Sequence, residues 1–234
     1  MGSRRWKGPL SWCKQPYTSR FENDRRRCNV NGIAGRGRDS PANDLEIKLF
    51  SPTPDNPLFS NDPAAEARLL NHLTGTGLAP RLHETLATPL GSVVLYTHVA
   101  GSSWRSYPAP VGRVLARLHR HPAPPDLDLA PYDSRALLAQ GLDILDRRPN
   151  ISVTERLRNL TPSSATAPSR IAALLHGDVV PGNVIQSPIG DITLIDWQCP
   201  AVGAPVHDLA IFLSPAMQHV YRDTPLSQAE AVPF

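Results

Sequence analysis

A regular alternation of apolar and polar residues first appears at Leu45, because the preceding forty or so positions show no sustained periodicity. The alternation predicts a strand with one apolar face. Its apolar positions are Leu45, Ile47 and Leu49, and the intervening ones are Glu46, Lys48 and Phe50. Two further runs, 81–86 and 92–99, flank Pro89 and Gly91 and predict two strands joined by a turn. Lys48 points away from the apolar face of the first strand.

Between the first and second of these strands the pattern changes to helical spacing. Asn61-Asp62-Pro63 provides a capping side chain followed by proline in the first turn, and Gly75 and Gly77 mark the end. The inward stripe consists of Glu66, Leu69, Leu70 and Leu73. A carboxylate on a buried stripe needs a partner, and Lys48 of the preceding strand could supply it. The alternatives are a solvated lysine and a glutamate at the edge of the stripe.

The second half of the chain predicts mainly helices with one small hairpin. A helix over 111–118 would end near His119–Pro122, and a second, starting at 133 or 134, would bury one leucine face. The leucines of that face are Leu137, Leu138, Leu142 and Leu145. Strands at 183–186 and 191–195 would form a hairpin, and 207–217 would form a helix with Asp208 near its start. His119 and His121 could suggest a metal site, but such a pair at a helix end is more often structural.

The polar residues with the most specific spacing lie before and after the predicted hairpin. His176-Gly177-Asp178 is followed by Asn183, and a short apolar run ends in Asp196-Trp197. This matches the frame in which protein kinases place a base, H-x-D-x-x-x-x-N, and then a metal-binding aspartate. Phosphoryl transfer needs the proton of the nucleophile accepted, the metals held and the phosphate charge neutralised. The alternative is a polar loop whose Asp and Asn side chains only cap turns.

Composition indicates a folded chain without a membrane span. The 234 residues are 41% hydrophobic, enough for one large domain or two lobes, and the 25 prolines indicate many loops. No apolar run reaches about 18 residues, and the N-terminus lacks the apolar stretch of a secretory signal. Cys13, Cys28 and Cys199 cannot all pair and show no metal-ligand spacing. We therefore expect a cytoplasmic location.

Positive charge is concentrated at the beginning of the chain. Residues 1–40 hold 10 Lys and Arg against 3 Asp and Glu, whereas residues 41–234 hold 14 against 18. Clustered arginine attracts phosphate, so an arm that binds nucleic acid is one interpretation, and a transit peptide is another. No nucleic-acid-binding motif surrounds the arginines. We expect a poorly ordered or divergent head, and neither nucleic acid nor a membrane as a partner.

With these residues identified, the chain resembles the aminoglycoside phosphotransferase and choline kinase-like family over roughly residues 41–220. The matching features are Lys48, Glu66, His176-Gly177-Asp178, Asn183, Leu194-Ile195-Asp196-Trp197 and Asp208-Leu209-Ala210. The resemblance implies an α+β, two-lobed, protein-kinase-like fold. Residues 41–100 would form a small β-rich lobe that binds nucleotide, and residues 101–234 a mainly helical lobe that carries the catalytic loop and the metal and substrate sites.

The resemblance also implies roles for individual residues, with ATP and Mg²⁺ as cofactors. Asp178 would accept the proton of a substrate hydroxyl, with His176 bracing the loop, while Asn183 and Asp196 would hold magnesium. Lys48, oriented by Glu66, would contact the phosphates, and Asp208 would orient the loop backbone. A hinge near Gly101 would leave the backbone of the preceding segment free to meet the adenine. The residues of that segment are Tyr96, Thr97, His98 and Val99.

The resemblance predicts an ATP-dependent phosphotransferase that acts on a hydroxyl of a small polar molecule. Choline, ethanolamine, thiamine, a sugar or an aminoglycoside would all be compatible, and the oligomeric state cannot be read from the sequence. Two departures favour an alternative, a catalytically inactive nucleotide-binding or regulatory module. The glycines at 32, 35 and 37 have poor strands on either side, and only 26 residues follow Asp208, so the second lobe could be truncated.

Overall fold

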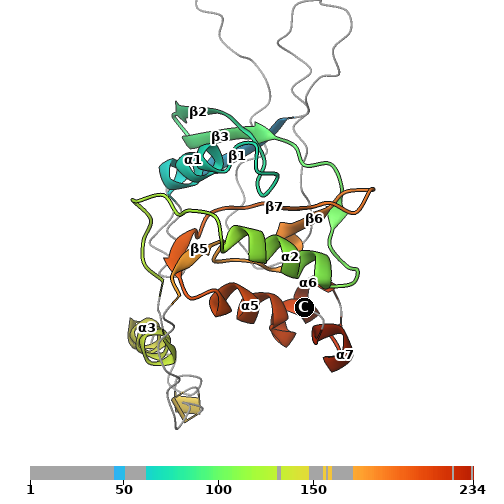
Figure 1. Ribbon diagram of the computed structural model, residues 1–234. Helices are drawn as coiled ribbons and strands as arrows, with labels where there is room; N and C mark the ends of the chain where they lie inside the picture. Colours follow the sequence, from blue (N-terminus) through green and yellow to red (C-terminus); the bar gives the residue numbers. More distant parts are fainter. Residues whose placement is uncertain are drawn as a thin grey trace, which may run out of the picture.

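The computed structural model describes residues 45–50, 62–130, 133–147, 155, 156, 158, 159, 171–222, 224–232 and 234. The described residues form two lobes, and the smaller consists of one antiparallel sheet and one helix (Figure 1). The basic head, the three glycines at 32, 35 and 37, and two of the three cysteines lie outside the described residues. The expected mixed fold with a small β-rich lobe and a mainly helical lobe is confirmed.

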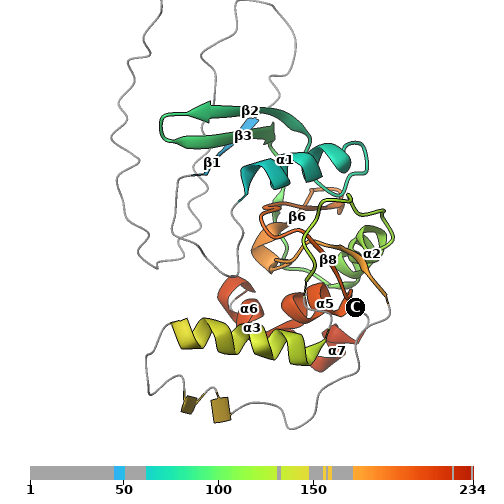
Figure 2. The ribbon, with the colours of Figure 1, turned by 90° about the vertical axis from the view of Figure 1, so that its left-hand side faces the viewer.

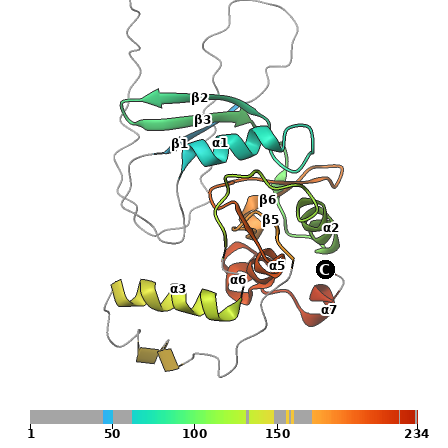
Figure 3. The same cartoon turned by 60° about the vertical axis from the view of Figure 1, so that its left-hand side comes forward.

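The sheet of the small lobe has the strand order β1-β3-β2. Its strands are β1 (Leu45–Phe50), β2 (Leu82–Thr88) and β3 (Gly91–Thr97). Helix α1 (Pro63–His72) lies between this sheet and the large lobe, as the views in Figures 1, 2 and 3 agree. The predicted turn around Pro89 and Gly91 joins β2 to β3, and Gly91 has a φ of 133°, in a region that favours glycine.

The apolar face of β1 is the exposed face of the strand. Ile47 and Leu49 are 41% and 39% exposed, whereas Phe50 is buried. Lys48 pairs in register with the fully buried Val94 of β3, so both side chains lie on one face of the sheet. Burial here depends on which face α1 covers, and the alternation of residue types within one strand does not reveal that.

Helix α1 follows the predicted pattern. Asp62 caps it by accepting a 2.8 Å hydrogen bond from the backbone N–H of Ala64, and proline occupies the first turn. All four stripe residues are buried: Glu66, Leu69, Leu70 and Leu73. The helix therefore brings one carboxylate into the interior, together with leucines that fix its orientation against the sheet.

The large lobe is built around α2 (Ala109–Leu118) and two short sheets. Three strands form one sheet in the order β4-β6-β7, and two strands form the other. The first sheet contains β4 (Ser102–Ser103), β6 (Val184–Gln186) and β7 (Ile192–Leu194), and the second contains β5 (Ala173–Leu175) and β8 (Ala201–Gly203). The predicted hairpin is thus present as β6 and β7. A 3₁₀ turn, η1 (Pro181–Asn183), leads directly into β6 and carries the asparagine of the motif.

Two helical predictions for the large lobe need correction. Helix α3 (Ser134–Arg147) forms, but it buries none of its residues and Leu137 is 50% exposed. It lies at the outer edge of the large lobe, away from the three-stranded sheet of the small lobe (Figures 1 and 2). The single helix expected over 207–217 is two helices, α5 (Val206–Leu213) and α6 (Pro215–Arg222). Ser214 is extended, with a ψ of 120°, as is usual for a residue before proline.

The core joins the two lobes. Buried residues of α1 and β3 belong to the same hydrophobic cluster as residues of α2, β7 and α5, and Trp104, Trp197 and Phe212 are its largest fully buried members. A final short helix, α7 (Gln228–Ala231), begins with a capping box formed by Ser227 and Glu230. None of the helices in the described ranges is both long and apolar enough to cross a membrane.

Candidate active site

The loop between β5 and β6 carries the motif residues and is held in a tight conformation. Gly177 has a φ of 79°, in the left-handed region, and a Cβ atom at this position would collide with the carbonyl oxygen of Cys199. Only glycine avoids both problems. The backbone that carries the neighbouring residues His176 and Asp178 is therefore closely confined at Gly177.

Asp178 and Asn183 face each other across this loop. The Nδ2 atom of Asn183 donates to Oδ2 of Asp178 at 2.9 Å and to the backbone oxygen of Asp178 at 3.0 Å. Burial raises the pKa of Asp178 from 3.8 to about 6, and the negative charge of Asp196 acts in the same direction. The hydrogen bond from Asn183 opposes this rise. A carboxyl group with such a pKa can accept a proton near neutral pH.

Lys48 connects the small lobe to the second aspartate of the motif. Its Nζ atom lies 2.6 Å from Oε2 of Glu66 and 2.6 Å from Oδ1 of Asp196. The predicted pair of a strand lysine and a helix glutamate is therefore present. Glu66 is 1% exposed, and burial raises its pKa while Lys48 opposes the rise. One ammonium group thus lies between two carboxylates that come from different lobes.

Asp196 itself has an uncommon backbone conformation. Its φ of 66° is the only positive value among the described residues that are not glycine. Aspartate tolerates this left-handed region better than most residues, at a modest energetic cost. The turn comes directly after β7, and it directs the Asp196 carboxylate toward Lys48 while Trp197 enters the core.

His176 is fully buried and both of its ring nitrogens have partners. Nε2 lies 3.0 Å from the carbonyl oxygen of Ile195, and Nδ1 accepts the backbone N–H of Asp178 at 3.2 Å. A neutral imidazole with its proton on Nε2 satisfies both contacts. Burial lowers the pKa of His176, which favours that neutral form. The ring also packs on Trp197, with centroids 4.3 Å apart. This geometry suits a brace for the loop and leaves no ring atom to react.

Asp208, in the first turn of α5, accepts hydrogen bonds from the backbone of the same loop. Its Oδ2 accepts the backbone N–H of His176 at 3.0 Å, and its Oδ1 accepts that of Gly177 at 2.9 Å. The side chain is fully buried, and a third donor, Nε2 of His119, lies 2.9 Å from Oδ2. The three bonds satisfy a carboxylate that burial would otherwise make costly.

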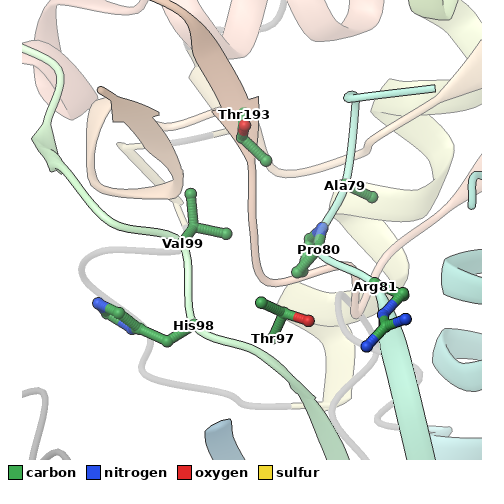
Figure 4. A pocket seen from close by; sticks show the side chains of 7 residues that line it. All are labelled: Ala79, Pro80, Arg81, Thr97, His98, Val99 and Thr193. Atoms are coloured by element: carbon green, nitrogen blue, oxygen red, sulfur yellow. The ribbon is translucent and has the colours of Figure 1, made fainter. Parts of the chain in front are cut away.

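The segment expected to meet an adenine lies away from this polar cluster. A cavity of about 560 Å³ has Thr97, His98 and Val99 on one side (Figure 4). Ala79, Pro80, Arg81 and Thr193 complete its lining, so none of the motif carboxylates contributes to it. Tyr96 is buried within β3, and the backbone N–H of Thr97 is already donated to Arg81. Among the four predicted residues, only His98 and Val99 lie beyond the paired part of β3.

Comparison with known proteins identifies the family of this chain. The family model described as the phosphotransferase enzyme family, APH, matches residues 51–232. The chain belongs to this phosphotransferase family. The resemblance found from the sequence motifs is therefore confirmed, and the chain is a phosphotransferase of the class that acts on small molecules. A search of curated proteins gives no match.

Solved structures with a similar fold include two phosphotransferases and a choline kinase. The AMP-bound spectinomycin phosphotransferase APH(9)-Ia is 18% identical, with a TM-score of 0.50 over 84% of this chain and 70% of that one. Macrolide 2'-phosphotransferase MphH from Brachybacterium faecium is 19% identical, with a TM-score of 0.49 over 82% and 73% of the two chains. Choline kinase LicA from Streptococcus pneumoniae is 18% identical, with a TM-score of 0.47 over 86% and 78%.

The donor atoms of this candidate site suit a hard cation. The described residues contain no cluster of three or more His, Cys, Asp or Glu side chains placed to hold a metal ion. Asn183 and Asp196 nevertheless offer one amide and one carboxylate oxygen, and Asp178 lies beside Asn183. Magnesium commonly takes one or two such protein ligands and completes its shell with water and phosphate. This donor set fits magnesium better than it fits zinc, which prefers nitrogen and sulfur.

Two residues that contact the candidate site were not found from the sequence. His119 was set aside as one of two histidines at a helix end, yet it reaches Asp208 across 89 positions. Cys199, whose carbonyl oxygen packs against Gly177, carried no motif at all. Burial raises the pKa of the Cys199 thiol to about 12, with Asp178 and Asp196 adding to the rise, so the thiol stays protonated. The sequence offered one signal for His119: it directly follows Leu118, which belongs to the buried stripe of α2.

Proposed function

We propose that the protein transfers the γ-phosphate of ATP to a hydroxyl group of a small polar molecule. One observation carries the proposal: Lys48 links a helix carboxylate of the small lobe to Asp196, while Asp178 and Asn183 face each other on the adjoining loop. Positioning and charge neutralisation account for most of the catalysis of phosphoryl transfer, so such a constellation supplies what the reaction needs. Membership of the phosphotransferase family supports the same reaction class.

In the proposed reaction Asp178 is the base. The acceptor oxygen attacks the γ-phosphorus, the bond from that phosphorus to the β,γ-bridging oxygen breaks, and ADP departs. The acceptor proton passes to the carboxylate of Asp178. Asn183, through its bond to Oδ2, keeps the carboxylate oriented, and the raised pKa of Asp178 matches a proton acceptor working near neutral pH.

Lys48, Asn183 and Asp196 are the proposed phosphate and metal residues. The ammonium of Lys48, held by the buried Glu66, would contact the phosphates of ATP. The amide oxygen of Asn183 and the carboxylate of Asp196 would hold magnesium. Bound there, the ion would offset the negative charge of the β- and γ-phosphates. Lys48 and magnesium would then both neutralise Asp196, whose Oδ1 lies 2.6 Å from Nζ of Lys48.

The linker between the lobes is the proposed site for the base of the nucleotide. His98 and Val99 follow β3 and lie beyond its sheet pairing, so their backbone groups are the ones we assign to the adenine edge. Tyr96 and Thr97 would position them from within the strand. We place the division between the lobes near residue 100, with 41–100 and 101–234 as the two parts. The AMP complex of the structurally similar spectinomycin phosphotransferase supports nucleotide binding by this fold.

The acceptor is proposed only as a chemical class. Solved relatives are named for choline, macrolides and spectinomycin, and these compounds share a polar or cationic character and a free hydroxyl. Choline, ethanolamine, thiamine, a sugar or an aminoglycoside would each present such a hydroxyl to Asp178.

An acceptor screen that follows ADP release with magnesium and ATP tests the proposal. At least one hydroxyl compound should accelerate ADP release and appear as a phosphorylated product by mass spectrometry. Asp178→Asn should lower its rate by about 100- to 10,000-fold, because the proton acceptor is removed. Asp191→Asn is the matched control, since Asp191 is an exposed aspartate on the hairpin turn. Equal activity in the Asp178 variant and the wild type would refute the assigned base.

A further inference from the structure

The imidazole of His119 lies under the catalytic loop although it comes from a different part of the large lobe. It follows the last residue of α2, and its Nε2 atom is 2.9 Å from Oδ2 of Asp208. The His119 side chain is 10% exposed and the Asp208 side chain is fully buried. Because the ionised carboxylate can only accept, the ring nitrogen must donate this bond.

The same carboxylate oxygen also accepts the backbone N–H of His176, the residue two positions before Asp178. The other oxygen accepts the N–H of Gly177, next to Asp178. A chain of direct bonds thus runs from α2 through His119 and Asp208 to the backbone of the catalytic loop. Each member is fixed by a different element, since Asp208 belongs to α5 and the loop follows β5.

We propose that His119 is a positioning residue, which fixes the Asp208 carboxylate so that the catalytic loop presents Asp178 in its working orientation. The proposal rests on the proposed function, since Asp178 is there the base. His119 bonds to Asp208, so its effect on Asp178 would pass through the Asp208 carboxylate and the loop backbone. Without the third donor, the buried carboxylate could rotate, and its two bonds to the loop would weaken.

The location of His119 on α2 explains why it can act as a fixed donor. The helix is anchored by Leu115 and Leu118, both fully buried, and the backbone N–H of His119 donates to Leu115 at 2.8 Å. A side chain at this end of α2 therefore moves little relative to the core.

Three variants separate positioning from general stability. His119→Leu removes the donor but keeps an apolar side chain, and His119→Gln keeps an N–H at a similar reach. His121→Leu is the control, since His121 lies two residues further on and contacts other groups: its Nδ1 lies 3.0 Å from the carbonyl oxygen of Pro122 and its ring centroid 5.1 Å from that of His72. With the acceptor found in the screen, kcat should fall about 10- to 100-fold in the leucine variant while the KM for ATP stays within about twofold. The glutamine variant should recover most of the lost kcat, and the control should match wild type.

A second measurement does not depend on activity. Hydrogen exchange of the His176 and Gly177 amides, followed by NMR, should be about tenfold faster in His119→Leu than in wild type and near wild type in His119→Gln. If no acceptor is ever phosphorylated, the proposed function fails, yet this measurement still decides whether His119 holds the loop. Unchanged exchange would overturn the positioning role even if the melting temperature falls. Unchanged kcat in an active enzyme would overturn it as well. If the leucine variant does not fold, His119→Asn, whose amide is too short to reach Asp208, replaces it.

Discussion

Lys48 and Asp196 are 148 positions apart in the chain, and their side chains meet at 2.6 Å. The lysine belongs to the sheet of the small lobe, and the aspartate follows a strand of the large lobe. Because Lys48 also contacts the buried Glu66, its ammonium group lies between two negative charges. This contact ties the relative position of the two lobes to the charge of a single side chain.

Removing that charge should destabilise the protein. Lys48→Met leaves Glu66 buried without its cationic partner, and such a change costs about 3–5 kcal/mol when the pair is mostly buried. The double variant Lys48→Met/Glu66→Leu removes both charges and should recover much of this loss. Urea unfolding of the wild type, both single variants and the double variant measures the coupling. Additive effects of the two single changes would show that the ion pair contributes no interaction energy.

The Lys48 variant should also bind nucleotide more weakly. Titration calorimetry with ADP and magnesium should give a Kd raised by about 10- to 100-fold, because a lysine at this position would contact the phosphates. Arg68, an exposed basic residue on the outer side of α1, provides a control in Arg68→Met. If both variants bind ADP as tightly as wild type, the phosphate role proposed for Lys48 is wrong.

The sequence predicted the parts of this fold that depend on local chemistry. The capping by Asp62, the inward stripe of α1 and the hairpin of β6 and β7 are each encoded within about a dozen neighbouring residues. The spacing of Asp178 and Asn183 on one loop, together with Asp196 after the next strand, was readable for the same reason.

The features that were missed depend on contacts between distant segments. The exposure of Ile47 and Leu49 follows from the position of α1, which no pattern within β1 contains. Helix α3 has the leucine spacing of a buried helix, yet Leu137 is exposed and Leu138, Leu142 and Leu145 are only partly buried. His119 meets Asp208 only because α2 and α5 pack near the same loop. A histidine has no periodic signal that distinguishes this role from a surface position.

Replacing the proposed base should raise stability while it lowers activity. In the folded protein the pKa of Asp178 is raised from 3.8 to about 6, so the folded state binds the proton more tightly than the unfolded state. The folded state therefore loses stability as pH rises from 3.8 to about 6, and the loss is complete near neutral pH. Asp178→Asn avoids the buried charge and should be more stable by about 1–2 kcal/mol near neutral pH.

The pH dependence of this gain distinguishes it from a simple packing effect. The advantage of Asp178→Asn over wild type should shrink as pH falls below the folded pKa, because the wild-type carboxyl then becomes neutral too. Thermal unfolding at a series of pH values measures this difference. A stability gap that stays constant across the series would mean that ionisation of Asp178 is not its source.

Neutralising Asp196 should move the pKa of Asp178 downward. After burial, the charge of Asp196 is the largest cause that raises this pKa, so Asp196→Asn should bring it closer to its ordinary value of 3.8. NMR titration of the Asp178 carboxyl carbon in metal-free protein gives the two values. Asp191→Asn, on the exposed hairpin turn, should leave the pKa unchanged. An equal or higher pKa in Asp196→Asn would show that the two carboxylates do not interact.

The conformation of Gly177 should make this position far less tolerant than another glycine with a similar backbone. Gly177 and Gly190 have φ values of 79° and 95°, so alanine is strained at both. A Cβ atom at 177 would also collide with the Cys199 carbonyl, whereas the space around Gly190 is open within 4 Å. Gly190→Ala should cost about 1 kcal/mol and leave activity intact, and Gly177→Ala should cost about 2–4 kcal/mol. Because the displaced backbone also carries the bonds to Asp208, kcat of the folded Gly177 variant should fall as well. Paired urea unfolding and steady-state kinetics test both positions, and equal effects would show that Cys199 does not confine the catalytic loop.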